Sequence, residues 1–194
     1  MTALKLGRTR RLSREAGDRL VREIMSLPDL VRKVLAQSGS IAQIAEKYAS
    51  ANDMFFIGRG ILYPVALEGA LKIKEVAYVH AEGYQAAELK HGPIALLSEK
   101  TPVVALLADV PGKEKTLGNV QECRARNAPV IAVATEGDDD AASATDAMFV
   151  PKTSPELAPI VSAVALQLFA YHVARLRGCE IDQPRNLAKS VTVE

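Results

Sequence analysis

The sequence predicts an α/β protein, a parallel-sheet three-layer sandwich preceded by a helical arm. Short apolar runs alternate with helical patterns of about 10 to 15 residues, which is typical of a parallel sheet. Hydrophobic residues make up 48% of the 194 residues but aromatic residues only 5%, so the core must consist mainly of Ala, Val, Leu and Ile. The formal net charge of +1 excludes a strongly charged, disordered chain and indicates no nucleic-acid partner.

The first part of the chain is predicted to be helical. Apolar residues recur at helical spacing in the segments 15–27 and 29–36, and Ser40 is placed to cap a third helix. We therefore assign residues 1–50 to a helical arm and residues 51–194 to the sandwich domain with its C-terminal tail.

The sandwich domain begins with a strand, a glycine turn and a helix. The apolar run 54–57 stops at Gly58-Arg59-Gly60, and a helical pattern with Pro64 in its first turn continues to about residue 79. The remaining elements alternate in the same way, with strands expected at 102–108, 129–134 and 148–150 and a helix at 113–126.

The segment 157–174 carries no charge and reaches the length of a membrane span. It also contains Pro159, Ser162, Gln167 and His172, so we interpret it as a buried core helix and expect no membrane contact.

The two cysteines indicate the compartment. Cys123 and Cys179 have neither CxxC spacing nor a neighbouring His, which argues against a zinc site and favours reduced thiols. The basic N-terminal run lacks the apolar core of a secretory signal. We expect a cytoplasmic protein that needs no metal and no cofactor.

Ionisable groups that could carry chemistry gather between residues 68 and 93. At about 100° per residue, Glu68, Lys72 and Glu75 share one face of the predicted helix, whereas Lys74 points elsewhere. An ordinary solvated ion pair remains an alternative, since Glu and Lys at this spacing are common on helix surfaces. The loop expected after the helix, from His80 onward, contains His91 between Lys90 and a Gly-Pro pair, and a structural His remains the alternative there.

At these residues the sequence resembles a known family. The block ALEGALKIKEVAYVHAEGYQAAELKHGPIAL and the terminal DQPRNLAKSVTVE are similar to the second sugar-isomerase (SIS) lobe of the glutamine–fructose-6-phosphate aminotransferases, also called glucosamine-6-phosphate synthases. The resemblance covers residues 14–194. It implies the isomerase part of a cytoplasmic homodimeric enzyme that converts fructose 6-phosphate and glutamine-derived ammonia to glucosamine 6-phosphate, with a first SIS lobe and a glutaminase domain as partners.

The resemblance also implies roles for individual residues. Glu75 matches the glutamate that moves a proton between C1 and C2 of the sugar, and Lys72 matches a lysine that stabilises nearby charge. His91 matches a ring-opening histidine that reaches into the site of a neighbouring subunit. Lys189 matches the lysine that forms an imine with the substrate carbonyl, and Ala188 matches a backbone contact to the sugar, so the tail is expected to close on the site.

Departures from the family pattern indicate an incomplete enzyme. The family's glutaminase module begins with a cysteine after the initiator Met, whereas this chain begins Met1-Thr2, and we expect no glutamine hydrolysis. The Ser/Thr-rich phosphate loop of the first lobe is also missing. Gln37-Ser38-Gly39-Ser40 follows a helical stretch and is interpreted as a turn and cap, and the strand end 109–112 has no hydroxyl cluster. We expect the chain to be inactive alone.

Two other functional classes stay open. A free-standing single-lobe phosphosugar isomerase would need its own hydroxyl-rich phosphate loop, and a phosphosugar-binding regulatory module would lack the acid/base set.

Three weaker sequence signals are interpreted as structural features without a functional role. The turn Gly58-Arg59-Gly60 lacks the third glycine of a dinucleotide fingerprint, with Tyr63 in its place, the segment 138–140 is a solvated acidic turn, and the basic run before Glu15 is the remnant of an inter-lobe connection.

Overall fold

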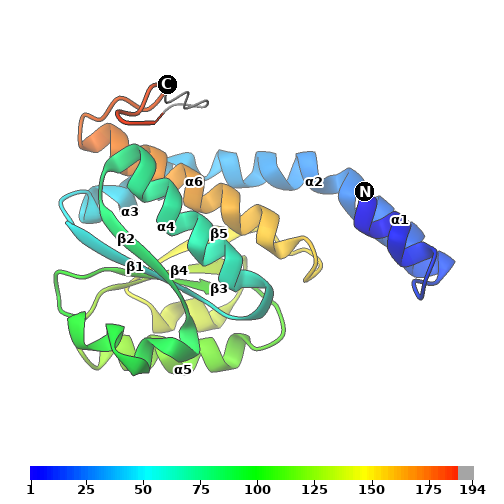
Figure 1. The fold of residues 1–194 in the computed structure, drawn as a ribbon, viewed down its shortest axis with the longest axis horizontal. Helices are drawn as coiled ribbons and strands as arrows, with labels where there is room; N and C mark the ends of the chain where they lie inside the picture. The colour runs from blue at the N-terminus through cyan, green and yellow to red at the C-terminus, as the bar shows by residue number, and fades with distance from the viewer. Residues whose placement is uncertain (188–194) are drawn as a thin grey trace, which may run out of the picture.

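The protein, described over residues 1–187 by a computed structural model, is built on a five-stranded parallel sheet in the order β2-β1-β3-β4-β5. The strands are β1 (Asp53–Gly58), β2 (His80–Gln85), β3 (Val103–Leu107), β4 (Val130–Thr135) and β5 (Asp146–Val150). The predicted α/β class is confirmed, because helices connect the parallel strands and cover both faces of the sheet (Figure 1).

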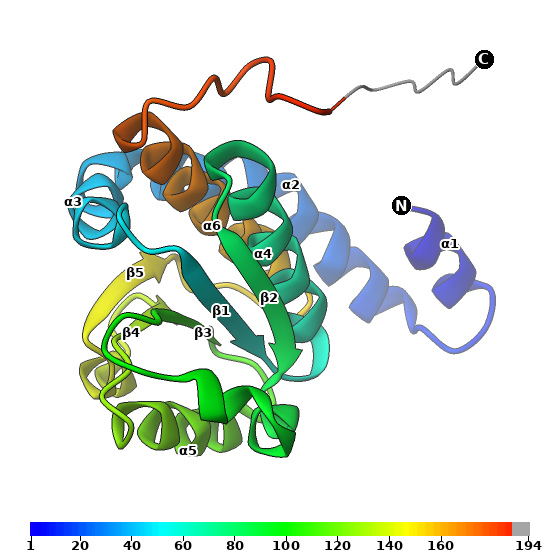
Figure 2. The same ribbon diagram turned by 60° about the vertical axis from the view of Figure 1, so that its left-hand side comes forward.

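The three layers enclose two apolar cores. Helices α3 (Ser38–Tyr48), α4 (Tyr63–Ala77) and α6 (Ala158–Leu176) cover one face, and α5 (Lys113–Arg124) with short 3-10 helices covers the other (Figures 1 and 2). Successive strand residues point to opposite faces, so Val104 and Ile131 join the first core while Val103 and Val130 join the second. The 3-10 helices are η1 (Gly60–Leu62), η2 (Ala86–His91), η3 (Pro93–Leu96) and η4 (Asp139–Ser143).

The helices of the arm differ in detail from the prediction. The two expected helices form one, α2 (Arg14–Ala36), which continues through Pro28. A proline removes a single N–H donor, and the helical apolar spacing continues on both sides of it. The cap assigned to Ser40 is wrong. Helix α3 begins earlier, and Ser40 lies in its first turn and donates to the Gln37 carbonyl at 2.8 Å.

The arm projects from the domain at its N-terminal end, where α1 (Thr2–Arg8) and the first turns of α2 lie away from the sheet (Figure 1). The C-terminal part of α2 and the whole of α3 instead contact α6, and Ile41, Ala45 and Tyr48 are buried in the first core. The division of the chain at residue 50 stays a prediction.

Strand β2 was not predicted, because the segment from His80 was interpreted as a loop. Within residues 1–187 it is an edge strand that pairs only with β1, and among its six residues only Ala81 is fully buried, so it has no apolar run to mark it. Its Gly83 lies against α4, where a Cβ atom would be 2.8 Å from the Leu67 Cα atom. The glycine thus allows α4 to pack closely on the edge of the sheet.

Helix α6 is the apolar helix expected over residues 157–174. It satisfies the length and hydropathy of a membrane span, yet half of its most apolar window is buried and it packs against α4, α3 and α2. Phe169, Leu166 and Val173 belong to the first core. The buried helix predicted from the sequence is therefore observed.

Candidate active site on helix α4

Helix α4 presents three ionisable side chains together on its outer face. Lys72 Nζ donates to the Glu75 carboxylate at Oε2 and lies 3.8 Å from Glu68 Oε1. The side chains of Lys72 and Glu75 are 29% and 27% exposed, so both are partly shielded but accessible. The shared face expected from helical spacing is present, whereas the catalytic roles of these residues stay predictions.

The opposite face of α4 explains why these groups point outward. It buries small and aliphatic residues against the sheet and α6, and at Gly69 an added Cβ would be 2.7 Å from a Leu166 methyl carbon and 2.8 Å from the Phe56 ring. The buried residues are Val65, Ala66, Gly69, Ala70, Ile73 and Ala77. Because this face is packed, Glu68, Lys72 and Glu75 face away from the core.

Glu75 has one oxygen engaged and one open. Its Oε2 accepts from Lys72, while its Oε1 has no hydrogen-bond partner within residues 1–187. A half-shielded carboxylate with an open oxygen and a neighbouring ammonium can accept a proton from carbon and stabilise the negative charge that develops.

His91 lies at the other end of the domain from Glu75. It ends η2, which follows β2, whereas Glu75 is near the end of α4, which precedes β2. Strand β2 separates them by about 16 Å, at about 3.3 Å per residue. Figure 2 agrees, since η2 lies beside α5 whereas the end of α4 lies beside the C-terminal end of α6. One chain does not bring His91 to Glu75.

The predicted residues Ala188 and Lys189 lie outside the described residues. The tail is described to Leu187, and it contacts the end of α4 through Arg185. The backbone N–H of Arg185 donates to the Tyr78 hydroxyl at 2.8 Å, and its guanidinium carbon lies 4.2 Å from the centre of the Tyr78 ring. Neither Tyr78 nor Arg185 was predicted from the sequence as a site residue. The only signal was their place within the two blocks that resemble the aminotransferases.

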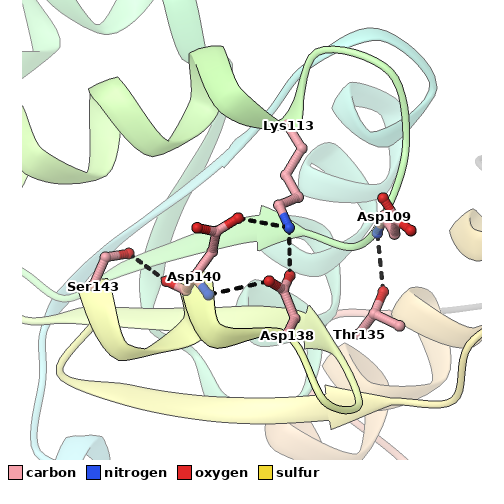
Figure 3. Close-up of polar contacts among 6 residues, drawn as sticks. All are labelled: Asp109, Lys113, Thr135, Asp138, Asp140 and Ser143. Carbon is pink, nitrogen blue, oxygen red and sulfur yellow. Dashed lines mark hydrogen bonds and ion pairs between the residues drawn. The ribbon is translucent and has the colours of Figure 1, made fainter.

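The carboxyl ends of β3 and β4 border a hollow of about 200 Å³ at the sheet edge where parallel α/β folds commonly bind ligands. Lys113 Nζ bonds Asp138 at 2.6 Å and Asp140 at 2.8 Å, and the Thr135 hydroxyl accepts from the Asp109 N–H at 2.9 Å. Figure 3 shows how these side chains face one another. Burial would lower the pKa of Lys113, but the two aspartates raise it above its ordinary value. This lysine is committed to internal carboxylates and is poorly placed to hold a phosphate.

The structure tests two interpretations from the sequence, that of the acidic segment 138–140 at this edge and that of the segment around Ser38 in the arm. The acidic segment 138–140 is solvated only in part: Asp139 is exposed as expected, whereas Asp138 caps η4, is 12% exposed and pairs with Lys113. Ser38, in the segment interpreted as a turn and cap, bonds His172 Nε2 of α6 at 2.8 Å, so its hydroxyl has a structural partner, but no side chain of the segment caps α3. Within residues 1–187, no group of three or more His, Cys, Asp or Glu side chains could hold a metal ion.

The chain is similar over its whole length to known aminotransferases. The aminotransferase of Thermus thermophilus, "Glutamine--fructose-6-phosphate aminotransferase [isomerizing]", is 54% identical over 100% of this chain, and the protein of the same name from Chlorobaculum tepidum is 47% identical over 100%. The chain spans about a third of these relatives, 32% of each. The C-terminal domain of the Francisella tularensis glucosamine-fructose-6-phosphate aminotransferase has a TM-score of 0.82 at 35% identity, with 89% of this chain and 49% of that chain covered.

A second solved structure extends the likeness beyond the aminotransferases. Tagatose-6-phosphate ketose/aldose isomerase from Escherichia coli has a TM-score of 0.67 at 26% identity, with 79% of this chain and 44% of that chain covered. The sequence profile described as the SIS domain matches residues 47–177, which is most of the chain and includes every strand of the sheet. The chain therefore belongs to the SIS domain family.

Proposed function

We propose that this chain is the isomerase lobe of an enzyme that converts fructose 6-phosphate and ammonia derived from glutamine to glucosamine 6-phosphate. The observation that carries the proposal is the Lys72–Glu75 pair on α4, in a chain that is 54% identical to an isomerizing aminotransferase. Glu75 acts as the base that removes a proton from C1 of the ketose and returns it at C2. A half-shielded carboxylate suits this task.

The other assigned residues prepare the substrate for that step. The amine of Lys189 attacks the substrate carbonyl, and water leaves as the C=N bond forms. Lys72 stabilises the negative charge that develops when Glu75 takes the proton, and Ala188 contacts the sugar through its backbone. His91 opens the sugar ring, because an imidazole side chain can both give and take a proton.

The position of His91 supports a homodimer. Since it lies a full strand length from Glu75 of its own chain, it serves the site of a second copy. The partners of the chain are then its own copy, a first SIS lobe and a glutaminase domain in a cytoplasmic enzyme, and the arm of residues 1–50 belongs to the connection between the lobes. The share of the relatives that the chain leaves uncovered is large enough for both additional parts.

We further propose that the chain alone does not turn over fructose 6-phosphate, even with ammonia supplied. Among residues 1–187, the hollow at the edge where a phosphate could bind is lined by Lys113, which two aspartates neutralise, by the exposed Lys152 and by one hydroxyl, that of Thr135, which is less than a hydroxyl-rich phosphate loop supplies. Losing several charge-assisted hydrogen bonds of about 1.5 to 3 kcal/mol each weakens substrate binding by orders of magnitude.

The test replaces Glu75 by Gln in a full-length aminotransferase that carries this lobe. The change keeps the side-chain shape but removes the proton acceptor, so turnover should fall by about 10² to 10⁴ while sugar binding survives. Lys74→Gln is the matched control, because Lys74 is exposed and lies off the shared face. Near-normal turnover by Glu75→Gln would contradict the role of Glu75.

The same assay on the 194-residue chain distinguishes the alternatives. No ammonia-dependent or aldose–ketose turnover is expected. Turnover that disappears in Glu75→Gln would instead show a complete site in one lobe and favour a free-standing phosphosugar isomerase. Sugar-phosphate binding without any turnover in the full-length enzyme would favour a regulatory binding module.

A further inference from the structure

A chain of polar contacts fastens η2, the short helix that ends at His91, to helix α5. Lys90 Nζ lies 2.6 Å from Glu122 Oε1, and Asn119 Nδ2 donates to Glu122 Oε2 at 3.1 Å. We propose that Lys90 and Glu122, here called the η2 tether, are positioning residues that fix the backbone of His91 and so set the place of its imidazole. The inference rests on the proposed function for the role of His91, while the tether itself stands on these contacts.

The His91 ring has no support from other side chains in the part of the molecule that the structure describes. His91 is exposed, and its ring makes no hydrogen bond and no ion pair within residues 1–187. The next residue, Gly92, has φ +154, and an added Cβ there would meet no atom within 4 Å. An exposed glycine restrains its neighbours little. The position of the imidazole therefore depends on the residues that precede His91.

The residues before His91 are held in two different ways. Ala86 and Leu89 are fully buried in the second core, to which α5 also contributes, and η2 lies against α5 (Figure 2). Apolar burial is non-directional, so it keeps η2 on the core but does not fix its rotation. The bond from Lys90 to Glu122 joins charged groups, is directional, and lies one residue from His91. It therefore supplies the orientation that burial alone does not.

The α5 end of the tether is anchored in its turn. Asn119 is 5% exposed, and its side-chain oxygen accepts from Arg59 Nη2, in the turn after β1, at 3.4 Å. The Arg126 guanidinium donates to the Glu122 backbone carbonyl at 2.8 Å. The Lys90 ammonium, assisted by Asn119 and Arg126 and opposed by partial burial, holds the pKa of Glu122 below its ordinary value. Glu122 is therefore a fixed carboxylate to which η2 is fastened.

The tether affects position more than stability. The side chains of Lys90 and Glu122 are 57% and 28% exposed, and an ion pair so close to water adds little to the free energy of unfolding. Proton transfer to a sugar oxygen, in contrast, requires the imidazole within hydrogen-bond reach, so a small displacement of η2 lowers its rate strongly. Breaking the tether should therefore slow ring opening in a chain that still folds.

The first experiment measures the tether without any substrate, by amide hydrogen exchange and mass spectrometry on the 194-residue chain. Glu122→Gln keeps the side-chain shape and removes the charge, and Lys90→Met removes the charge at the other end. We expect each to speed exchange in the peptide 86–92 by about 2- to 5-fold. Because an exposed ion pair adds little to stability, both variants should fold.

Glu114→Gln is the matched control. Glu114 also lies on α5, but it is exposed and makes no ion pair or side-chain hydrogen bond within residues 1–187. Exchange in the peptide 86–92 should equal that of the unchanged chain. Unaltered exchange in both Glu122→Gln and Lys90→Met would overturn the tether.

The second experiment measures turnover of fructose 6-phosphate by the full-length enzyme. We expect Glu122→Gln and Lys90→Met each to lower kcat by about 3- to 10-fold with little change in KM, and Glu114→Gln to leave both unchanged. The two variants break the same contact, so the double variant should be no slower than the slower single variant. Unchanged kcat in Glu122→Gln and Lys90→Met would overturn the positioning role.

The His91→Asn enzyme shows whether the tether acts through the imidazole. Its turnover should be lower by about 10²-fold, and adding Glu122→Gln should not lower it further, because no imidazole remains to be positioned. A further fall of about 3- to 10-fold would overturn the positioning role, since a merely structural loss persists without His91. Near-normal turnover by His91→Asn alone would overturn the proposed role of His91 and with it the positioning role, while hydrogen exchange would still decide whether the tether exists.

Discussion

Replacing Gly83 by Ala tests whether the close approach of β2 and α4 is as tight as the structure describes. A Cβ atom at this position would lie 2.8 Å from Leu67 Cα, 2.9 Å from Leu67 N and 3.0 Å from the Ala66 carbonyl oxygen. All three are backbone atoms of α4, so no side-chain rotation can relieve the contact. Either α4 or the edge strand must move by several tenths of an ångström.

The expected cost follows from two opposing effects. Overpacking lowers the free energy of unfolding by about 1 to 3 kcal/mol, and we expect Gly83→Ala near the upper end of this range because its neighbours are backbone atoms that cannot move aside. Alanine also restricts the unfolded chain more than glycine does, and this stabilises the folded state by about 0.4 to 1 kcal/mol, because the φ of Gly83 is accessible to alanine. The net destabilisation is about 2 kcal/mol, which for a chain of this size lowers the melting temperature by about 4 to 8 °C.

Thermal unfolding followed by far-UV circular dichroism measures this difference, with Gly118→Ala as control. Gly118 lies inside α5 and an added Cβ would meet no atom within 4 Å, so alanine should raise the melting temperature by about 1 to 4 °C. A Gly83→Ala chain that melts at or above the temperature of the unchanged chain would refute the reasoning, since α4 would then not be held tightly against β2.

Three further predictions concern titration, thiols and association. Burial, assisted by the charge of Arg175 and opposed by the Ser38 hydrogen bond, lowers the pKa of His172, so the folded state binds its proton less tightly than the unfolded state. The free energy of unfolding should therefore fall as the pH drops below about 6.5, by at most about 1.4 kcal/mol per pH unit, and urea titrations of His172→Gln should lack this part of the decline. Burial raises the pKa of Cys123 to about 12, so iodoacetamide should label Cys179 and spare Cys123 in the native chain, and mass spectrometry showing rapid double labelling would contradict this. The exposed leucines on the outer face of α4 predict self-association, and light scattering should show more than a monomer at about 100 μM.

The sequence by itself determined the elements that are buried on both sides. Strands β1, β3 and β4 are covered by helices on each face, so their apolar runs mark them directly, and the predicted bounds differ from the observed ones by one residue at each end. The shared face of Glu68, Lys72 and Glu75 also followed from sequence, because helical periodicity is a local property that packing did not change. The resemblance then directed attention to those residues.

Tertiary structure decided the features whose signal is not local. Strand β2 exists because β1 offers it a partner, and an exposed edge needs no apolar run. Asp138 forms an ion pair because Lys113, which lies on another element, is beside it in the folded chain. The separation of His91 from Glu75 depends on the direction of β2, and the tail contact joins Arg185 to Tyr78 across 107 positions. Hydrogen bonds and ion pairs between distant segments form only once the core has placed the segments side by side, and no pattern within either segment encodes the partner.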